Sequence, residues 1–262
     1  MGSNIEVVVT VVGSVVLALA GLVVVRRLVP YAVLTDHTAV ASAVYATLGV
    51  VYGVILGQLV VAAWDDFEGA RSAETAEAAS LFDLVRLAEA FPEPQQGELQ
   101  AAALAYGRAV VNREWAAMAA RAAPDPVAAA AMDGLYRRYT GLASGPIGGL
   151  APYAASLGEL NDLEDARGER LLASVRGLPE LMWVVLIAGG AVTVGFSYLF
   201  GVENRVAQAV MVAALAATVA LLLALIAALD SPFRDPVRIS PDGFARVLER
   251  AGAVVSATPG SR

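Results

Sequence analysis

The residues of this sequence that offer the clearest chemistry are three carboxylates at the end of a long uncharged segment. Asp65, Asp66 and Glu68 follow the uncharged run Ala39–Ala63 after a single residue, Trp64. In an assembly of several copies around one axis, these carboxylates would form a ring at a pore mouth that raises the local concentration of cations. In a single copy they would be the solvated start of a polar helix. Both interpretations concern ion attraction or solvation, and neither requires catalysis.

Apolar side chains recur at helical spacing within the same uncharged run. An apolar ring in a membrane pore can gate ion flow by excluding water. The predicted pore-lining residues are Tyr45, Tyr52, Ile55, Leu56 and Leu59. Ordinary packing against other helices is the alternative interpretation of these residues.

A strip of glycines marks another face of this run. Gly49, Gly53 and Gly57 recur every four residues, which leaves one face of a helix without side chains. Such a strip lets a second helix approach closely, so we predict a helix-packing surface there. Trp64 to Phe91 contains no Pro and one Gly, and the helix is therefore predicted to continue from the membrane into water.

Several classes of function are disfavoured by what the sequence lacks. It has no phosphate-binding loop, no Gly-x-Ser-x-Gly motif and no metal-binding His pair. One His and no Cys make a poor set of metal ligands, so we expect no metal and no cofactor. A net charge of −7 without clustered basic residues argues against nucleic acid as a partner. We therefore do not expect an enzyme.

The elements that must position these residues are membrane spans. The chain is 58% hydrophobic and 16% charged, which is too apolar for an ordinary soluble domain. A run of about 20 apolar residues crosses a bilayer core of about 30 Å, so the lipid bilayer is an expected partner. The predicted spans are Val7–Val25, Ala39–Ala63, Leu181–Val202 and Val206–Leu229.

A polar segment separates the second and third spans. Trp64–Gly177 carries 17 acidic and 10 basic residues, and proline and glycine clusters divide it into helices. After the first of these helices, the others are predicted over Gln95–Arg121, Val127–Leu142 and Leu150–Arg176. The predicted fold is an all-α polytopic membrane protein with four transmembrane helices and a helical soluble insert. Its predicted parts are a first transmembrane hairpin (1–63), an acidic helical domain (64–177), a second hairpin (178–229) and a polar C-terminal tail (230–262).

Charges near the spans bear on sidedness and on the insert. Six Arg near the spans lie on the insert side and three in the short loops, which favours a cell membrane protein with a cytoplasmic insert and cytoplasmic termini. Arg26 and Arg27, directly after the first span, favour the opposite orientation. Within the insert, Arg167 and Arg170 stand in a charge-rich turn. Salt bridges between insert helices are the favoured interpretation, and coupling to a gate is the alternative.

Several short motifs follow one another in a specific order as far as Phe244. They are Gly49-Val50-Val51-Tyr52 with Trp64 and Phe67, Glu114-Trp115 with Met118, Ala166-Arg167 with Arg170-Leu171, Leu178-Pro179 with Trp183, and Leu229-Asp230-Ser231-Pro232-Phe233 followed by Ser240-Pro241. In that order they resemble the bacterial family of unknown function described as bestrophin-like. Bestrophins are homopentameric ion channels with four spans per subunit and cytosolic helices. The resemblance therefore implies a pentamer, a cytoplasmic insert and a central pore lined by the second span.

Two departures from bestrophins limit this resemblance. The segment Asp230–Pro236 has only two acids and an intervening Arg, so we expect no calcium clasp. The second span also lacks the Phe residues of an aromatic neck. The leading hypothesis is a homo-oligomeric bestrophin-like ion channel, with a slight preference for monovalent cations as permeant ions because the insert is acidic. The alternative is a non-conducting membrane scaffold or signalling module whose insert binds a partner.

Overall fold

The computed structural model of the chain describes residues 2–29, 38–142 and 150–257. Within these ranges every regular element is helical and no strand occurs, which confirms the predicted all-α fold. The chain forms two compact units. The first comprises Met1–Asp66 and Gly177–Asp230, and the second comprises Phe67–Arg176 and Ser231–Arg262.

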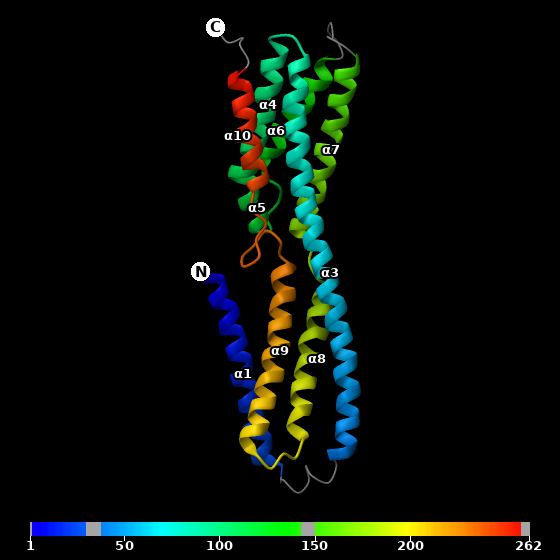
Figure 1. Cartoon of the computed structure of the whole chain (residues 1–262), viewed down its shortest axis with the longest axis vertical. Coiled ribbons are helices and arrows are strands. Elements are labelled where there is room, and N and C mark those ends of the chain that lie inside the picture. The colour runs from blue at the N-terminus through cyan, green and yellow to red at the C-terminus, as the bar shows by residue number, and fades with distance from the viewer. Residues whose placement is uncertain (1, 30–37, 143–149, 258–262) are drawn as a thin grey trace. The chain divides into compact units, whose positions relative to one another are not determined.

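The first unit is built from long apolar helices. They are α1 (Gly2–Leu28), the first part of α3 (Thr38–Leu87), α8 (Glu180–Phe196) and α9 (Arg205–Leu229), which lie side by side in Figure 1. Among the described residues, four helices are long and apolar enough to cross a membrane. The predicted helical continuation of the uncharged run Ala39–Ala63 into the charged segment is confirmed, because α3 is one helix of 50 residues.

Two small apolar clusters hold the first unit together. In one, Ala18 and Leu22 of α1 pack against Val212 and Ala216 of α9. In the other, Tyr52 and Leu56 of α3 pack against Leu186 of α8 and Ile226 of α9. Outside these clusters most large side chains of α1 are exposed in the single chain, as expected for a helix that is solvated by lipid.

The second unit consists of shorter helices around the remainder of α3. They are the 3₁₀ turn η1 (Ala88–Ala90), α4 (Gln95–Ala109), the π-helical turn η2 (Val110–Glu114), α5 (Trp115–Ala119), α6 (Pro126–Gly141), α7 (Leu150–Val175) and α10 (Asp242–Ala257). The three predicted helices after Pro94 are confirmed to within a few residues at their ends. The π-helical turn inside the first of them was not predicted.

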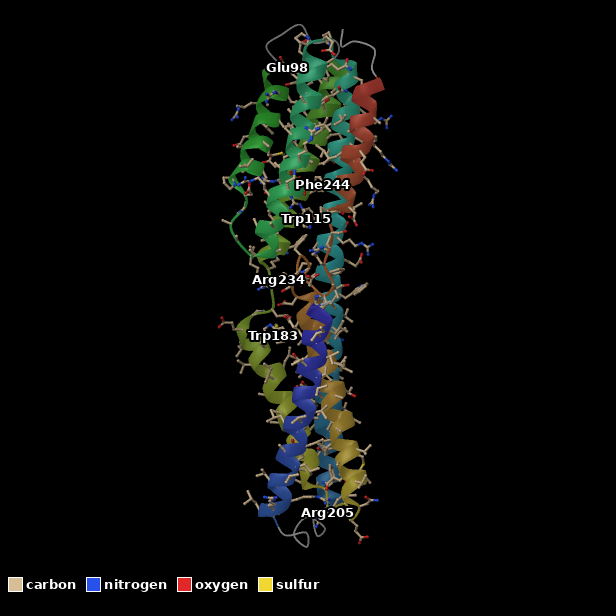
Figure 2. The ribbon with its side chains drawn as sticks, turned by 90° about the vertical axis from the view of Figure 1, so that its left-hand side faces the viewer. Glu98, Trp115, Trp183, Arg205, Arg234 and Phe244 are labelled. Carbon is tan, nitrogen blue, oxygen red and sulfur yellow. The ribbon has the colours of Figure 1, made fainter. Side chains whose placement is uncertain are left out.

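The core of the second unit includes the C-terminal segment. Phe233 and Phe244 both lie edge-on to Trp115, at centroid distances of 5.7 and 6.1 Å, and Figure 2 labels the Trp115–Phe244 pair. The indole N–H of Trp115 donates a hydrogen bond to the Ile239 carbonyl at 3.1 Å. The described part of the predicted polar tail, from Ser231, therefore belongs to the second unit and supplies Phe233 and Phe244 to its core.

Candidate functional site

One face of α3 in the first unit packs tightly against α8. Tyr52 is buried, and its hydroxyl donates a hydrogen bond to the Leu186 carbonyl at 2.9 Å. A Cβ atom on Gly189 would lie only 2.7 Å from the Tyr52 ring, so the ring can take this position because residue 189 has no side chain. Leu56, one turn further along α3, is buried in the same cluster.

Tyr45 also makes its contacts inside the chain. Its ring stacks on Phe196 at a centroid distance of 6.0 Å and lies edge-on to Phe200 at 5.2 Å. Three of the five predicted pore-lining residues, Tyr45, Tyr52 and Leu56, thus make their contacts within the chain. Pore lining is a property of an assembly, which a single chain does not contain.

The other two predicted pore-lining residues border a groove. Ile55 is 38% exposed and Leu59 is half-buried. Together with Val54 and Gln58 of α3 and with Leu181 and Val185 of α8, they line an almost wholly apolar groove of about 390 Å³. The groove is open along the side of the first unit and can receive apolar side chains from another molecule.

The opposite flank of α3 carries the glycine strip. An ideal Cβ placed on Gly49, Gly53 or Gly57 meets nothing within 4 Å among the described residues. The neighbouring side chains of Val50 and Val54 are 67% and 59% exposed. The predicted packing surface is therefore not used by any described helix of this chain, and a partner helix would have to come from another molecule.

The predicted acidic residues lie where the apolar part of α3 ends. Asp65 and Asp66 are exposed and are the last α3 residues of the first unit. Glu68, in the second unit, lies 3.6 Å from Arg71, and both side chains are largely solvated. Such an exposed pair contributes little to stability.

A buried ion cluster forms the most polar site of the second unit. The Arg170 Nε donates to Glu77 Oε2 at 2.5 Å, and its Nη2 donates to Glu77 Oε1 at 3.0 Å and to Glu114 Oε2 at 2.7 Å. All three side chains are fully buried. Arg167 Nη2 donates to the other Glu114 oxygen at 2.6 Å, and the Tyr106 hydroxyl donates to Glu77.

Pairing controls the protonation of this cluster. Burial alone would lower the pKa of Arg170, but the charge and hydrogen bonds of Glu77 outweigh burial and hold that pKa above its ordinary value. Burial, reinforced by the Glu77 carboxylate, raises the pKa of Tyr106 well above its ordinary value. Both groups therefore remain protonated donors at neutral pH. The carboxylates are fully engaged, so the cluster is suited to fixing helices and not to acid–base catalysis.

The local structure explains how Glu114 reaches Arg170. Glu114 is the last residue of the π-helical turn η2, which adds one residue to the turn and rotates the following helix. Trp115 then stacks on the Arg170 guanidinium, whose central carbon lies 5.2 Å from the ring centroid. The sequence correctly favoured salt bridges between insert helices. It did not identify Glu77, although a Glu between the apolar α3 residues Ala73 and Leu81 was a usable signal.

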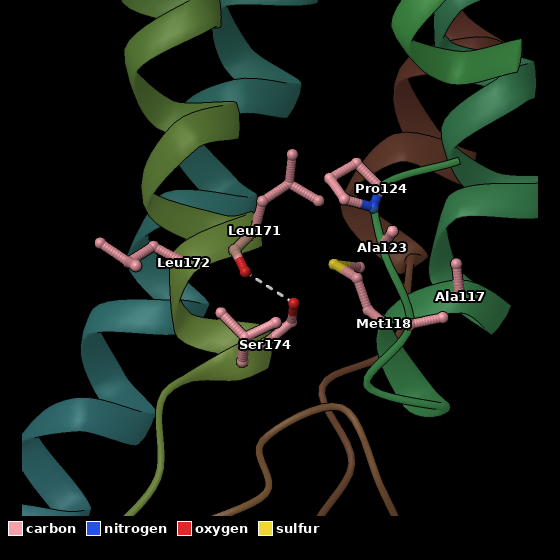
Figure 3. Close-up of a pocket in the computed structure, with 9 residues that line it drawn as sticks. Ala117, Met118, Ala123, Pro124, Leu171, Leu172 and Ser174 are labelled. Atoms are coloured by element: carbon pink, nitrogen blue, oxygen red, sulfur yellow. Dashed lines mark hydrogen bonds between the residues drawn. The ribbon is translucent and has the colours of Figure 1, made fainter. Parts of the chain in front are cut away.

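An apolar cavity lies beside this cluster. It has a volume of about 250 Å³ and lies between the end of α7 and the α5–α6 connection, where Met118, Pro124 and Leu171 form part of its wall (Figure 3). Its one hydroxyl, on Ser174, donates to the Leu171 carbonyl at 2.6 Å. Within the described ranges, no three His, Cys, Asp or Glu residues are grouped to hold a metal ion.

The sequence of this chain matches the family model of the bestrophin-like domain over residues 12–244. The chain belongs to the bestrophin-like family. Three crystal structures of a bacterial bestrophin homologue from Klebsiella pneumoniae share its fold. Two are structures of variants. The first has a TM-score of 0.72 and 12% sequence identity, and the match covers 97% of this chain and 100% of that chain. The second has a TM-score of 0.75 and 13% sequence identity, and the match covers 96% of this chain and 99% of that chain. The third, phased with zinc, has a TM-score of 0.71 and 12% sequence identity, and the match covers 95% of this chain and 99% of that chain. No curated protein sequence matches the chain.

The bestrophin-like motifs have clear structural uses in this chain. Tyr52 joins α3 to α8 in the first unit. Trp115, Arg170 and Phe244 meet in the core of the second unit, where the Arg170 guanidinium carbon lies 5.9 Å from the Phe244 ring centroid. With its long apolar helices, this bestrophin-like chain is a membrane protein.

Proposed function

We propose that this chain is one subunit of a homo-oligomeric ion channel of bestrophin type in the cell membrane. Its four long apolar helices cross the bilayer, and Trp64–Gly177 forms a soluble insert between the second and third spans. The insert and both termini lie on the cytoplasmic side, and by resemblance to bestrophins the subunit number is five. The family supports ion conduction as the function, and the open face of α3 supports assembly around a shared axis.

The observation that carries the proposal is the unpartnered flank of α3. A Cβ on Gly49, Gly53 or Gly57 would meet no atom of another described helix within 4 Å, although small residues at this spacing favour close helix approach in membranes. On the other flank, Ile55 and Leu59 border an open apolar groove. In a closed ring, one flank of each subunit meets the other flank of the next subunit. The glycine strip of one copy would thus face the groove of its neighbour.

This arrangement directs the face between the two flanks toward the axis. Val50 and Val61 share that face at helical spacing, and each is more than half exposed. Asp65 continues the same face at its polar end. Ile55 and Leu59 remain at the edge of the proposed pore lining. Tyr45, Tyr52 and Leu56 act behind it by holding α3 against α8.

The acidic residues favour monovalent cations as the permeant ions. Asp65 and Asp66 are exposed, and several copies of them around one axis would attract cations. Neutralising both in Asp65→Asn/Asp66→Asn should lower the potassium-to-chloride permeability ratio. An unchanged permeability ratio would contradict the proposal that Asp65 and Asp66 attract cations at the pore mouth.

The test of conduction uses the absence of native cysteine. Val61→Cys places a thiol on the proposed axis face, and Val12→Cys places one on α1 at a similar exposure, 55% against 56%. Each variant is reconstituted in liposomes, and ion flux is measured before and after treatment with a charged thiol reagent. We expect inhibition of Val61→Cys and no effect on Val12→Cys. Equal responses would refute the assignment of the axis face.

The assembly is tested separately by native mass spectrometry in detergent. We expect a homo-oligomer that dissociates in Gly53→Leu, because a bulky side chain blocks close approach along the strip. A monomeric mass combined with no ion flux would refute the channel and favour the non-conducting scaffold whose insert binds a partner.

A further inference from the structure

The first unit contains a second open cavity, where the end of α1 meets the start of α9. Its volume is about 800 Å³. Three guanidinium groups line it, from Arg26 and Arg27 at the end of α1 and Arg205 at the start of α9 (Figure 2 labels Arg205). Toward the middle of the helices its wall is apolar and includes Leu22 and Ala209.

The packing of α1 against α9 places the arginines at the cavity. Leu22 packs against Val212, and Arg26 follows Leu22 by one helical turn on the same face. Gly21 lets the ring of Tyr198, in the connection between α8 and α9, lie against α1, because a Cβ there would lie 3.0 Å from that ring. Arg26 is fixed by a hydrogen bond from its Nη2 to the Val202 carbonyl at 2.7 Å. Among the described residues, its other N–H groups have no hydrogen-bond partner and can donate to a ligand.

Positive charge predominates among the described residues of the cavity wall. They include three arginines and one carboxylate, that of Glu203. Among the described residues, none of these arginines forms an ion pair with a carboxylate within 4.0 Å. Guanidinium groups bind phosphate oxygens through paired N–H donors, so the charged end of the cavity is suited to a phosphate group.

The position of the cavity selects an amphiphilic ligand. Arg26 and Arg27 end one apolar helix and Arg205 begins another, so the charged end lies at the level where a span meets lipid headgroups. The apolar wall continues from there along the spans. An inorganic anion would use only the charged end. An anionic phospholipid would use both, with its phosphate at the arginines and the start of an acyl chain against Leu22 and Ala209.

We propose that this cavity is a binding site for an anionic phospholipid, with Arg26, Arg27 and Arg205 as its phosphate ligands. The site depends on the placement of α1 and α9 in the bilayer and not on conduction. In the proposed topology it lies on the membrane side opposite the insert. It therefore gives these arginines a role in ligand binding as well as in the charge balance that orients the spans.

The test is lipid binding to the full chain in neutral detergent, followed by native mass spectrometry. Phosphatidylglycerol supplies the anionic headgroup, and phosphatidylcholine is the zwitterionic comparison. Each basic residue near an anionic headgroup contributes about fivefold to binding, so the triple Gln variant at the three arginines should lose roughly a hundredfold in phosphatidylglycerol affinity. A control with the same charge change replaces three exposed arginines of the second unit by Gln: Arg108, Arg137 and Arg138.

The control variant and a competing anion distinguish a lipid site from a general effect of charge and from a plain anion site. The control should bind phosphatidylglycerol like the natural chain, and phosphatidylcholine binding should not change in either variant. The proposed site is overturned if both triple variants lose the same phosphatidylglycerol affinity. It is also overturned if the variant at Arg26, Arg27 and Arg205 loses none. Displacement of the lipid by an equal concentration of inorganic phosphate would show an anion site and overturn the lipid assignment. If the triple variant does not fold, the single variant Arg205→Gln is used, and its phosphatidylglycerol affinity should fall about fivefold. The readout is lipid binding, so a silent channel would not affect it.

Discussion

Removing the central guanidinium of the buried ion cluster should destabilise the second unit strongly. In Arg170→Met, Glu77 loses two hydrogen bonds, at 2.5 and 3.0 Å, and Glu114 loses one at 2.7 Å. Both carboxylates stay fully buried, and only Glu114 keeps a cationic partner, Arg167. The variant therefore leaves an uncompensated charge in the core.

The expected magnitude follows from burial. Breaking a buried ion pair by removing one partner costs about 3–5 kcal/mol, because the remaining charge is neither hydrated nor paired. We expect a loss of this size in the unfolding free energy. The matched control is Arg71→Met, which removes an arginine that is 64% exposed and 3.6 Å from its partner. Exposed pairs contribute about 0.2–1 kcal/mol, so the control should change stability by less than about 1 kcal/mol.

The assay can observe the second unit alone. The chain has three Trp, and replacing Trp64 and Trp183 by Phe leaves Trp115, which stacks on Arg170. Urea unfolding in detergent followed by Trp115 fluorescence then reports this core. The double variant Arg170→Met/Glu77→Gln should recover about 1–2 kcal/mol of the lost unfolding free energy, because the uncompensated Glu77 charge is removed. A loss in Arg170→Met no larger than in Arg71→Met would refute the assigned role of the cluster.

Two further predictions concern the α3–α8 contact and the pH dependence of stability. In Gly189→Ala the new methyl group would meet the Tyr52 ring at 2.7 Å, so we expect about 1–3 kcal/mol of destabilisation by thermal unfolding. Gly53→Ala, with no neighbour within 4 Å, should not destabilise the monomer, and equal losses would contradict this packing. Burial raises the pKa of Glu74, more than its hydrogen bond from Thr75 lowers it, so the native state favours the protonated carboxyl and loses stability as pH rises through that pKa. Glu74→Gln should be more stable than the natural chain by about 1 kcal/mol at pH 8 and equal below about pH 4; a variant that is less stable at pH 8 would disprove this.

The open face of α3 and the basic cavity both lie on the surface of the first unit. The α3 face is apolar and consists partly of glycines, which allows another protein helix to approach closely. The cavity combines guanidinium groups with an apolar wall, which suits a lipid. These two surfaces of the first unit thus differ in chemistry, and their tests are independent.

The sequence by itself determined the helical membrane fold. Uncharged runs such as Val206–Leu229 have few stable conformations in lipid other than a spanning helix, because every backbone group must be hydrogen-bonded within the segment. The same local logic predicted the continuation of α3, since no Pro interrupts it after Ala63. The insert helices were predictable because proline and glycine clusters end them.

Only the tertiary structure decided which residues meet. Glu77 and Arg170 are 93 residues apart, and no local pattern pairs them. The spacing of apolar residues also gave no sign of the π-helical turn that brings Glu114 to Arg170. Tyr52 and Ile55 looked equivalent in sequence, yet Tyr52 is buried against Gly189 and Ile55 borders an open groove. The physical reason is that hydrophobic spacing reports which side chains avoid water, and in a membrane helix it does not distinguish a partner helix from lipid.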